Sequence, residues 1–472
     1  SGLRFEVGRI EGNVFDDAVI HELILLDPKG EFARFNRVEL EWSPLAWITS
    51  GLNVDRLVAQ RGTLSRFPEL LPGDPDAPIL PDFDIRIGKL ALENLTLAPG
   101  LAGEEAQSIG LTARADIRSG RVYLKADGQL GEQDALALLV DAEPDGDLFD
   151  LDLSYSAPQG GIIAGMIGTQ SGYSVRLTGD GSWSQWNGDL VVREDDRALA
   201  ALELTNQAGR YAIKGLIYPG NNISGIPANA LGQRVALGAA GTLEDSLLDG
   251  AIAINGRGLR LRGEGEVDLA GNRFDEFDVE GRVTDPAILG GSTTIEGAAF
   301  NARLNGAFRN LGIAHQLTID RFAAGEASIS DITQRGTATF DGTIWRLPMD
   351  ARIGSVRTGA DFVDPKLVGG QLTGLLKLEN ALLTSDNLRL AFPDARAQLG
   401  VRGDLAAGSY SLTGPVEVQN LAIENVGSMS GRSEIDFDIR DNGVWALRTE
   451  FDARVPSTTN ATLANIAGGN IR

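Results

Sequence analysis

The protein has 472 residues, more than one ordinary compact core accommodates, and 43% of them are hydrophobic, as in a folded rather than a disordered chain. Its formal net charge of −23 argues against a surface for nucleic acid or anionic membranes, because both depend on Lys and Arg. The absence of cysteine excludes disulfides and thiolate metal sites.

The start of the chain predicts strands around one short helix, followed by a proline-rich connection. Ser43 can cap a helix that Gly51 ends. Five prolines then fall within 68–81, which is typical of a linker. We therefore expect an N-terminal β block at 1–67 and a connection at 68–81.

From residue 82 onward, short runs alternate apolar and polar residues and are separated by Gly, Asn and Asp. Alternate side chains of a strand point to opposite faces, so each run has one apolar and one polar face. The pattern predicts an all-β fold, an elongated curled β-sheet that forms an open groove, with a few short helices between strand blocks. Short hairpin-like connections favour antiparallel neighbours. We place the strand blocks at 82–218, 219–290 and 291–455, and a helical tail at 456–472.

Short helices are expected where apolar turns interrupt the strands. Segments 285–291 and 364–370 are near copies, each with Asp-Pro, an apolar turn and a Gly pair. This loose repetition predicts one-turn helices between blocks of strands. The apolar segment 157–168 predicts another short helix.

The residues that carry chemistry are few. His21 and His315 are the only histidines, which excludes a His-rich metal site. The sequence has no nucleophile elbow, Walker loop or dinucleotide fingerprint, and its acidic pairs lack EF-hand spacing. A pair of carboxylates that meet in space, as glycosidases require, stays open. The scattered tryptophans favour core or turn packing over ligand stacking. We expect no enzyme, no catalytic residue, no metal and no cofactor.

The functional question is what covers the apolar face. A trough lined by aliphatic side chains suits acyl chains, which need no hydrogen-bond partners. Two walls packed on each other as an ordinary sandwich would produce the same alternation, so both alternatives stay open. The residues expected to line a lipid groove are Ile85, Ile87, Val175, Leu177, Leu190, Val192, Ile252, Ile254, Leu259 and Leu261.

Several segments, in their order along the chain, resemble the TamB proteins of the AsmA-like superfamily. These are the inner-membrane partners of the translocation and assembly module. The segments are GNVF at 12–15, VELEWSPL at 38–45, GLNV at 51–54, RFP at 66–68, PDFDIRI at 81–87, APQGG at 157–161, LTGDGSWSQWNGDL at 177–190 and TNATLANIAGG at 459–469.

The resemblance implies a function in the envelope of a Gram-negative bacterium. It implies a periplasmic protein, anchored in the inner membrane in its full length, that conducts phospholipid toward the outer membrane along a β groove. It also implies a role in outer-membrane assembly and an outer-membrane partner of the Omp85 type, similar to TamA. The chain lacks the anchor helix and the partner-binding C-terminal domain of that family, so we expect an internal fragment, with the partner bound through a region outside it.

A second function would use the sheet differently. The edge of a long sheet can pair with a strand of another protein by β-augmentation. The alternative prediction is therefore a scaffold or chaperone for outer-membrane proteins and autotransporters, which needs no lipid.

Overall fold

The computed structural model describes residues 3–13, 17–46, 51–69, 83–101, 106–131, 133–143, 146–159, 161, 171–220, 223–244, 246–405, 407–423, 427–439, 445–458, 462 and 465. These residues form 28 strands, one α-helix and one 3₁₀ helix. The chain divides into unit 1, Ser1–Tyr218, and unit 2, Pro219–Arg472.

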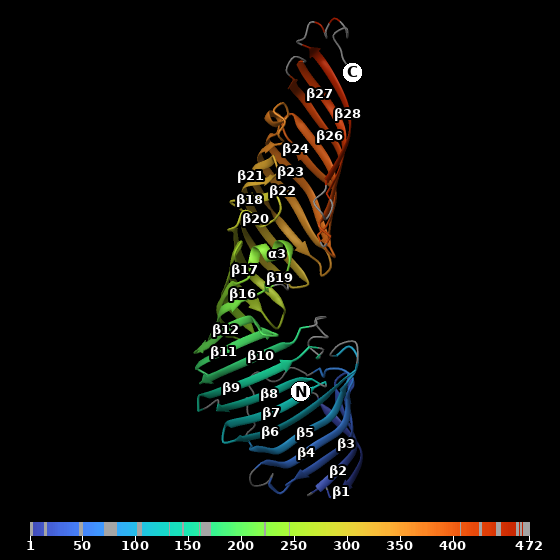
Figure 1. The fold of residues 1–472 in the computed structure, drawn as a ribbon. Coiled ribbons are helices and arrows are strands. Elements are labelled where there is room, and N and C mark those ends of the chain that lie inside the picture. Colours follow the sequence, from blue (N-terminus) through green and yellow to red (C-terminus); the bar gives the residue numbers. More distant parts are fainter. Residues whose placement is uncertain are drawn as a thin grey trace. The chain divides into compact units, whose positions relative to one another are not determined.

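Unit 1 is a single curved layer of strands (Figure 1). Its strands are β1 (Arg4–Gly12), β2 (Asp17–Asp27), β3 (Gly30–Trp42), β4 (Leu52–Leu64), β5 (Ile85–Leu97), β6 (Gln107–Arg118), β7 (Arg121–Leu130), β8 (Asp134–Glu143), β9 (Leu148–Ala157), β10 (Tyr173–Gly181), β11 (Gln185–Glu194), β12 (Arg197–Gln207) and β13 (Arg210–Ile217).

Unit 2 begins with helix α3 (Gly225–Leu231) and then also consists of successive β-strands. Its strands are β14 (Val235–Glu244), β15 (Leu247–Asn255), β16 (Leu259–Asp268), β17 (Arg273–Val283), β18 (Thr293–Glu296), β19 (Ala299–Ala307), β20 (Asn310–Ala324), β21 (Ala327–Phe340), β22 (Trp345–Arg357), β23 (Val368–Glu379), β24 (Leu382–Ala391), β25 (Ala395–Asp404), β26 (Ser409–Ile423), β27 (Gly427–Ile439) and β28 (Trp445–Thr458), with the 3₁₀ helix η2 (Asp364–Lys366) before β23.

The predicted fold class is confirmed: the protein is all-β and each sheet is open and curled. Apart from β4 and β5, the described pairs of successive strands are antiparallel. Around β18 the order changes, because β17 pairs with β19 and β18 pairs with β20. Among the described residues, β4 and β5 form the one parallel pair, because the connection between them returns the chain to the same end of the sheet. The outermost strands of each unit pair with one neighbour of that unit, so neither sheet closes on itself.

β-bulges contribute to the curl. Glu22, Arg61 and Asn94 have positive φ values of 61°, 48° and 60°. At Asn94 the register of β5 against β6 shifts between Leu92 and Leu95, which are three residues apart yet pack in the same hydrophobic cluster. Without the bulge, Leu92 and Leu95 would point to opposite faces of the sheet. The extra residue of the bulge puts both side chains on the same face, and it increases the local bend and twist of the strand.

Two of the expected short helices fall within the described residues, and the structure forms neither of them in full. The prediction for 285–291 is wrong: this segment makes two overlapping turns, in which Ile288 N donates to Asp285 O and Gly290 N donates to Ala287 O. Segment 364–370 contains only the three-residue η2 before β23 begins. Helix α3 is not predicted by the sequence pattern, although Ser224 precedes it and Gly232 follows it, as helix caps do.

Three other helix predictions lie wholly or largely outside the described residues. They are the helix between Ser43 and Gly51, of which Ala46 alone is described as helical, the segment 157–168 and the tail 456–472.

Candidate functional site

Cross-strand register joins apolar residues into continuous rows on one side of unit 1. Residues directly paired on neighbouring strands point to the same face of a sheet. One row therefore crosses all thirteen strands through Ile10, Ile20, Val38, Ala59, Leu92, Leu111, Gly128, Leu136, Tyr155, Val175, Val192, Ala200 and Ile217. A second row contains Ala18, Leu40, Leu57, Leu90, Ala113, Ala126, Leu138, Leu153, Leu177, Leu190 and Leu202. We call this side the apolar face of unit 1.

Unit 2 has a corresponding apolar face. One row crosses it through Leu237, Ile254, Leu261, Gly281, Phe300, Leu317, Gln334, Ala351, Leu372, Leu390, Ala397, Val416, Ser433 and Phe451. Only Gln334 and Ser433 interrupt it with polar side chains.

The structure places all ten residues expected to line a groove on these two faces. In unit 1, Val175 and Val192 lie in the first row, and Leu177 and Leu190 in the second. Ile85 and Ile87 lie on the same face, because Ile87 is paired with Ala115, two residues from Ala113 on β6. In unit 2, Ile254 and Leu261 are direct partners, and Ile252 and Leu259 lie two residues from them on the same strands. Register brings each set together within its unit.

These side chains are not packed as core residues. Ile252 is 36% exposed, the other nine are partly exposed, and none of the ten is buried. The buried clusters of the described chain are small, namely Phe32, Ala33, Phe35, Val38, Ala59 and Leu95 in unit 1, and Ile353, Phe392 and Ala395 in unit 2. Covering the remaining apolar surface would contribute about 25 cal/mol per Å². Binding of an apolar ligand or partner to either face would therefore be favourable, because it would remove this surface from water.

The opposite face of each sheet is polar and internally paired. Arg303 donates from Nε and Nη2 to the two carboxylate oxygens of Asp278, at 2.7 and 2.8 Å, between β19 and β17. Arg121 pairs with Asp141 in the same way between β7 and β8. Such cross-strand pairs of opposite charge stabilise the sheet on its polar side.

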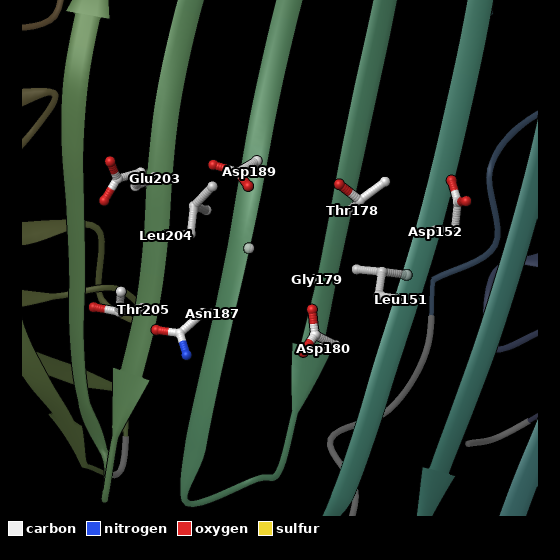
Figure 2. A pocket seen from close by; sticks show the side chains of 11 residues that line it. Leu151, Asp152, Thr178, Gly179, Asp180, Asn187, Asp189, Glu203, Leu204 and Thr205 are labelled. Carbon is white, nitrogen blue, oxygen red and sulfur yellow. The ribbon is translucent and has the colours of Figure 1, made fainter.

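A hollow of about 510 Å³ lies over β9 to β12 of unit 1 and belongs mainly to the polar face (Figure 2). Asp152, Asp189 and Glu203 stand on separate strands along it. Lys214 forms an ion pair with Glu203. Within the described residues, no group of three or more His, Asp and Glu could hold a metal ion. The hollow is acidic and has no concentrated ligand set.

Buried carboxylates lie at one edge of unit 1, where β2, β7, β9 and β11 end. Asp27 is fully buried and accepts two hydrogen bonds of 2.6 Å from Arg66. Asp134 is also fully buried and accepts from the Tyr155 hydroxyl at 2.7 Å. Burial and this carboxylate raise the pKa of Tyr155. We call these strand ends the carboxylate edge.

The third buried carboxylate of this edge is Glu194, which is 3% exposed. It accepts from the Tyr173 hydroxyl at 3.1 Å and from Arg197 at 2.7 Å. These three paired carboxylates bound the apolar face of unit 1 along this edge.

Sequence reasoning missed a polar residue inside the apolar face of unit 2. Gln334 is 6% exposed, and its Nε2 donates to Pro348 O at 3.0 Å while its Oε1 accepts from Asp350 N at 2.9 Å. The pairing of β21 with β22 is interrupted between Gln334 and Thr339, and Pro348 lies in this gap without an N–H to donate. The amide of Gln334 replaces the missing ladder bonds. Pro348 inside a strand pattern is the feature of the sequence that could have indicated this interruption of the ladder.

The histidines stand apart. His21 contacts Glu11 at 3.0 Å in unit 1, and His315 contacts Ile313 O at 3.2 Å in unit 2.

Among the residues that the structure covers, no helix is long and apolar enough to span a membrane. Comparison with family models, with curated proteins and with solved structures gave no match.

Proposed function

We propose that this protein is a lipid conduit in which acyl chains of phospholipids lie on the apolar faces of the two units. The observation that carries the proposal is the unbroken, partly exposed apolar row that crosses all thirteen strands of unit 1. A row without charges has no fixed binding point, so a bound chain can move along it from strand to strand.

Acyl chains fit this surface chemically. Each methylene group that leaves water contributes about 0.8 kcal/mol and needs no hydrogen bond. The face offers mainly Leu, Ile, Val and Ala, with a polar sheet face behind it. Exposed apolar surface of this extent normally marks an interaction site. Passive movement down a concentration gradient needs no catalytic group, so the proposed function is not enzymatic.

The first test is lipid analysis of the purified protein by native mass spectrometry, followed by extraction and identification of the bound species. We expect several phospholipids on each chain. A lipid-free protein that also takes up no fluorescent phospholipid would contradict the proposal.

Adjacent residues of β11 provide a matched pair of variants. Leu190→Asp introduces a charge into the apolar face, whereas Val191→Asp introduces the same charge on the polar face, opposite Arg176. We expect Leu190→Asp to abolish lipid uptake by unit 1 and Val191→Asp to retain it. Leu177→Asp and Ile254→Asp should lose lipid while keeping a strand-rich circular dichroism spectrum. Unfolding of these variants would indicate that their positions are core, because a buried unpaired charge costs several kcal/mol.

We further propose the cellular setting that such a conduit implies. It would act in the periplasm of a Gram-negative bacterium, moving phospholipid between the inner and outer membranes, with an Omp85-type outer-membrane partner similar to TamA. Support for this setting comes from the segments that resemble TamB proteins, such as LTGDGSWSQWNGDL at 177–190. Fractionation of cells that express the full-length protein, and cross-linking to outer-membrane proteins, would test it.

An assembly scaffold is the second candidate. In the described part of unit 1, β1 pairs with β2 along one side only, so its other side presents backbone groups to which a client strand could add. Cross-linking of an unfolded barrel protein to β1, in a protein without bound lipid, would favour this function over the conduit.

A further inference from the structure

The tryptophans of unit 1 gather at the edge opposite the carboxylate edge. Trp42 ends β3, Trp183 lies in the β10–β11 connection, and Trp186 is the second residue of β11. The connections β1–β2, β6–β7, β8–β9 and β12–β13 lie at the same edge, which we call the tryptophan edge. The other edge has tyrosines but no tryptophan among the described residues.

Trp186 belongs to the apolar face. A Cβ built on Gly179 would lie 2.1 Å from its ring, and one built on Gly188 would lie 2.3 Å from it, so the indole covers both glycines. Phe149 extends the aromatic group, with ring centroids 4.6 Å from Trp183 and 5.7 Å from Trp186. The indole Nε1 of Trp186 is buried and has no hydrogen-bond acceptor in the described part of the chain.

Unit 2 repeats the arrangement at the corresponding strand ends. Trp345 begins β22 and stacks on Phe340, the last residue of β21, at 4.7 Å between ring centroids. The register row that contains them also holds Phe274 and Tyr410. Phe392 is buried near the other edge, so phenylalanine does not distinguish the edges of unit 2. In unit 2, the position of Trp345 is therefore what distinguishes the two edges of the sheet.

The two edges of unit 1 offer different chemistry to a lipid. Indole rings favour the boundary between acyl chains and headgroups, because they combine a large apolar ring with one N–H donor. At the carboxylate edge, the hydroxyls of Tyr155 and Tyr173 are already bonded to Asp134 and Glu194. A phosphodiester there would find these hydroxyl donors already bonded to carboxylates.

The width of the apolar face also fits a lipid that lies across the strands. On β9 the apolar positions run from Phe149 to Tyr155, six residue steps or about 20 Å at a rise of about 3.4 Å per residue. One bilayer leaflet holds its acyl chains within about 15 Å, half of the hydrocarbon core. A chain anchored at the tryptophan edge therefore ends before the carboxylates.

We infer that each bound phospholipid lies across the strands in one orientation, with its ester and headgroup region at the tryptophan edge and its methyl ends toward the opposite edge. The inference rests on the proposed lipid conduit and adds a direction to it. Headgroups would then move along one side of each unit.

The test uses tryptophan fluorescence in proteins that keep one indole each. Trp→Phe substitution of the other five leaves either Trp186 or Trp345, and a third protein has all six replaced and carries Tyr173→Trp at the carboxylate edge. Each protein is loaded with phospholipid spin-labelled on the headgroup or near the methyl end of an acyl chain. We expect the headgroup label to quench Trp186 and Trp345 at least threefold more strongly, and the order to reverse for the indole at residue 173.

The outcomes separate the two proposals. Equal or reversed quenching at Trp186 would overturn the orientation and leave the conduit standing. No quenching by either label would overturn both. Wild-type protein with photoreactive lipids provides a second measurement that needs no substitution. A headgroup photoprobe should label residues around 182–187, and a methyl-end probe should label residues around Tyr155. The reverse distribution would contradict the inference.

Discussion

The position of Trp186 over two glycines can be tested by adding one methyl group. At Gly188, the three atoms nearest to an added Cβ all belong to the Trp186 ring, at 2.3, 2.8 and 2.9 Å. Ordinary van der Waals contact begins at 3.4 Å, so in Gly188→Ala the ring must move by about 1.1 Å. Phe149 and Trp183 form an aromatic group with this ring and resist the movement. Overpacking of this kind costs about 1–3 kcal/mol.

Gly110 provides the matched control within the same unit. It lies inside β6 of unit 1, and a Cβ there would find its nearest atom at 3.9 Å. Replacing a strand glycine by alanine without a clash gains roughly 0.5 kcal/mol, because the unfolded chain loses freedom. Gly188→Ala should therefore lower the free energy of unfolding by about 2 kcal/mol, whereas Gly110→Ala should leave it equal or slightly higher.

Urea unfolding followed by circular dichroism measures both effects. In a Trp186→Ala background the clash is gone, so Gly188→Ala should then cost no more than Gly110→Ala does. Equal unfolding midpoints for Gly188→Ala and Gly110→Ala in the wild-type background would refute the placement of the indole on the apolar face, and would remove the structural basis for the tryptophan edge in unit 1.

Two further predictions concern single polar side chains of unit 2. The backbone N–H groups of Ile344 and Thr343, together with Arg346, lower the pKa of Asp341 to about 2. Because the folded pKa lies below the unfolded value of about 3.9, the stabilisation is complete above about pH 4 and is lost as the pH falls through about 2. Asp341→Asn should thus unfold at lower temperature than wild type at pH 7, and the two melting curves should converge toward about pH 2; a constant difference would contradict the assignment. Gln334→Leu leaves Pro348 O and Asp350 N without their hydrogen-bond partner and should lower the free energy of unfolding by about 2 kcal/mol in a urea titration. Gln316→Leu, on the polar face, is the control and should be near neutral. Equal effects of the two substitutions would contradict the role of Gln334 in bridging β21 and β22.

Alternation predicted the fold class because it depends only on the pleat of a strand. In β10 and β11 no bulge separates Val175 from Leu177 or Leu190 from Val192, so their faces follow directly from spacing. The rule fails where a bulge adds a residue: Leu92 and Leu95 have the spacing of a helix but lie in one cluster of a sheet. A bulge is specified by tertiary bending as much as by the residue at its centre, and Asn94 alone does not predict it.

Pairings between distant strands were beyond the pattern. Spacing cannot show that β4 and β5 are parallel. The proline-rich sequence between them predicts a connection, but not the end of the sheet at which that connection leads into the next strand. Nor can it show that Gln334 faces Pro348, since the pair depends on the register of β21 against β22. The tryptophans are scattered in sequence, and only register reveals that Trp183, Trp186 and Trp345 all lie at strand ends of one type.

The net charge of −23 acquires a physical explanation from the two-faced sheet. A protein that leaves a large apolar face uncovered is at risk of pairing with a second copy through that face. Carboxylates such as Asp152, Asp189 and Glu203 project from the polar side of unit 1, where water solvates them and like charge repels other copies. Because these charges lie behind the apolar rows rather than in them, they can oppose self-association and leave the apolar rows uncharged. Acidity and an uncharged apolar face are therefore complementary properties of one sheet, separated by the alternation of its strands.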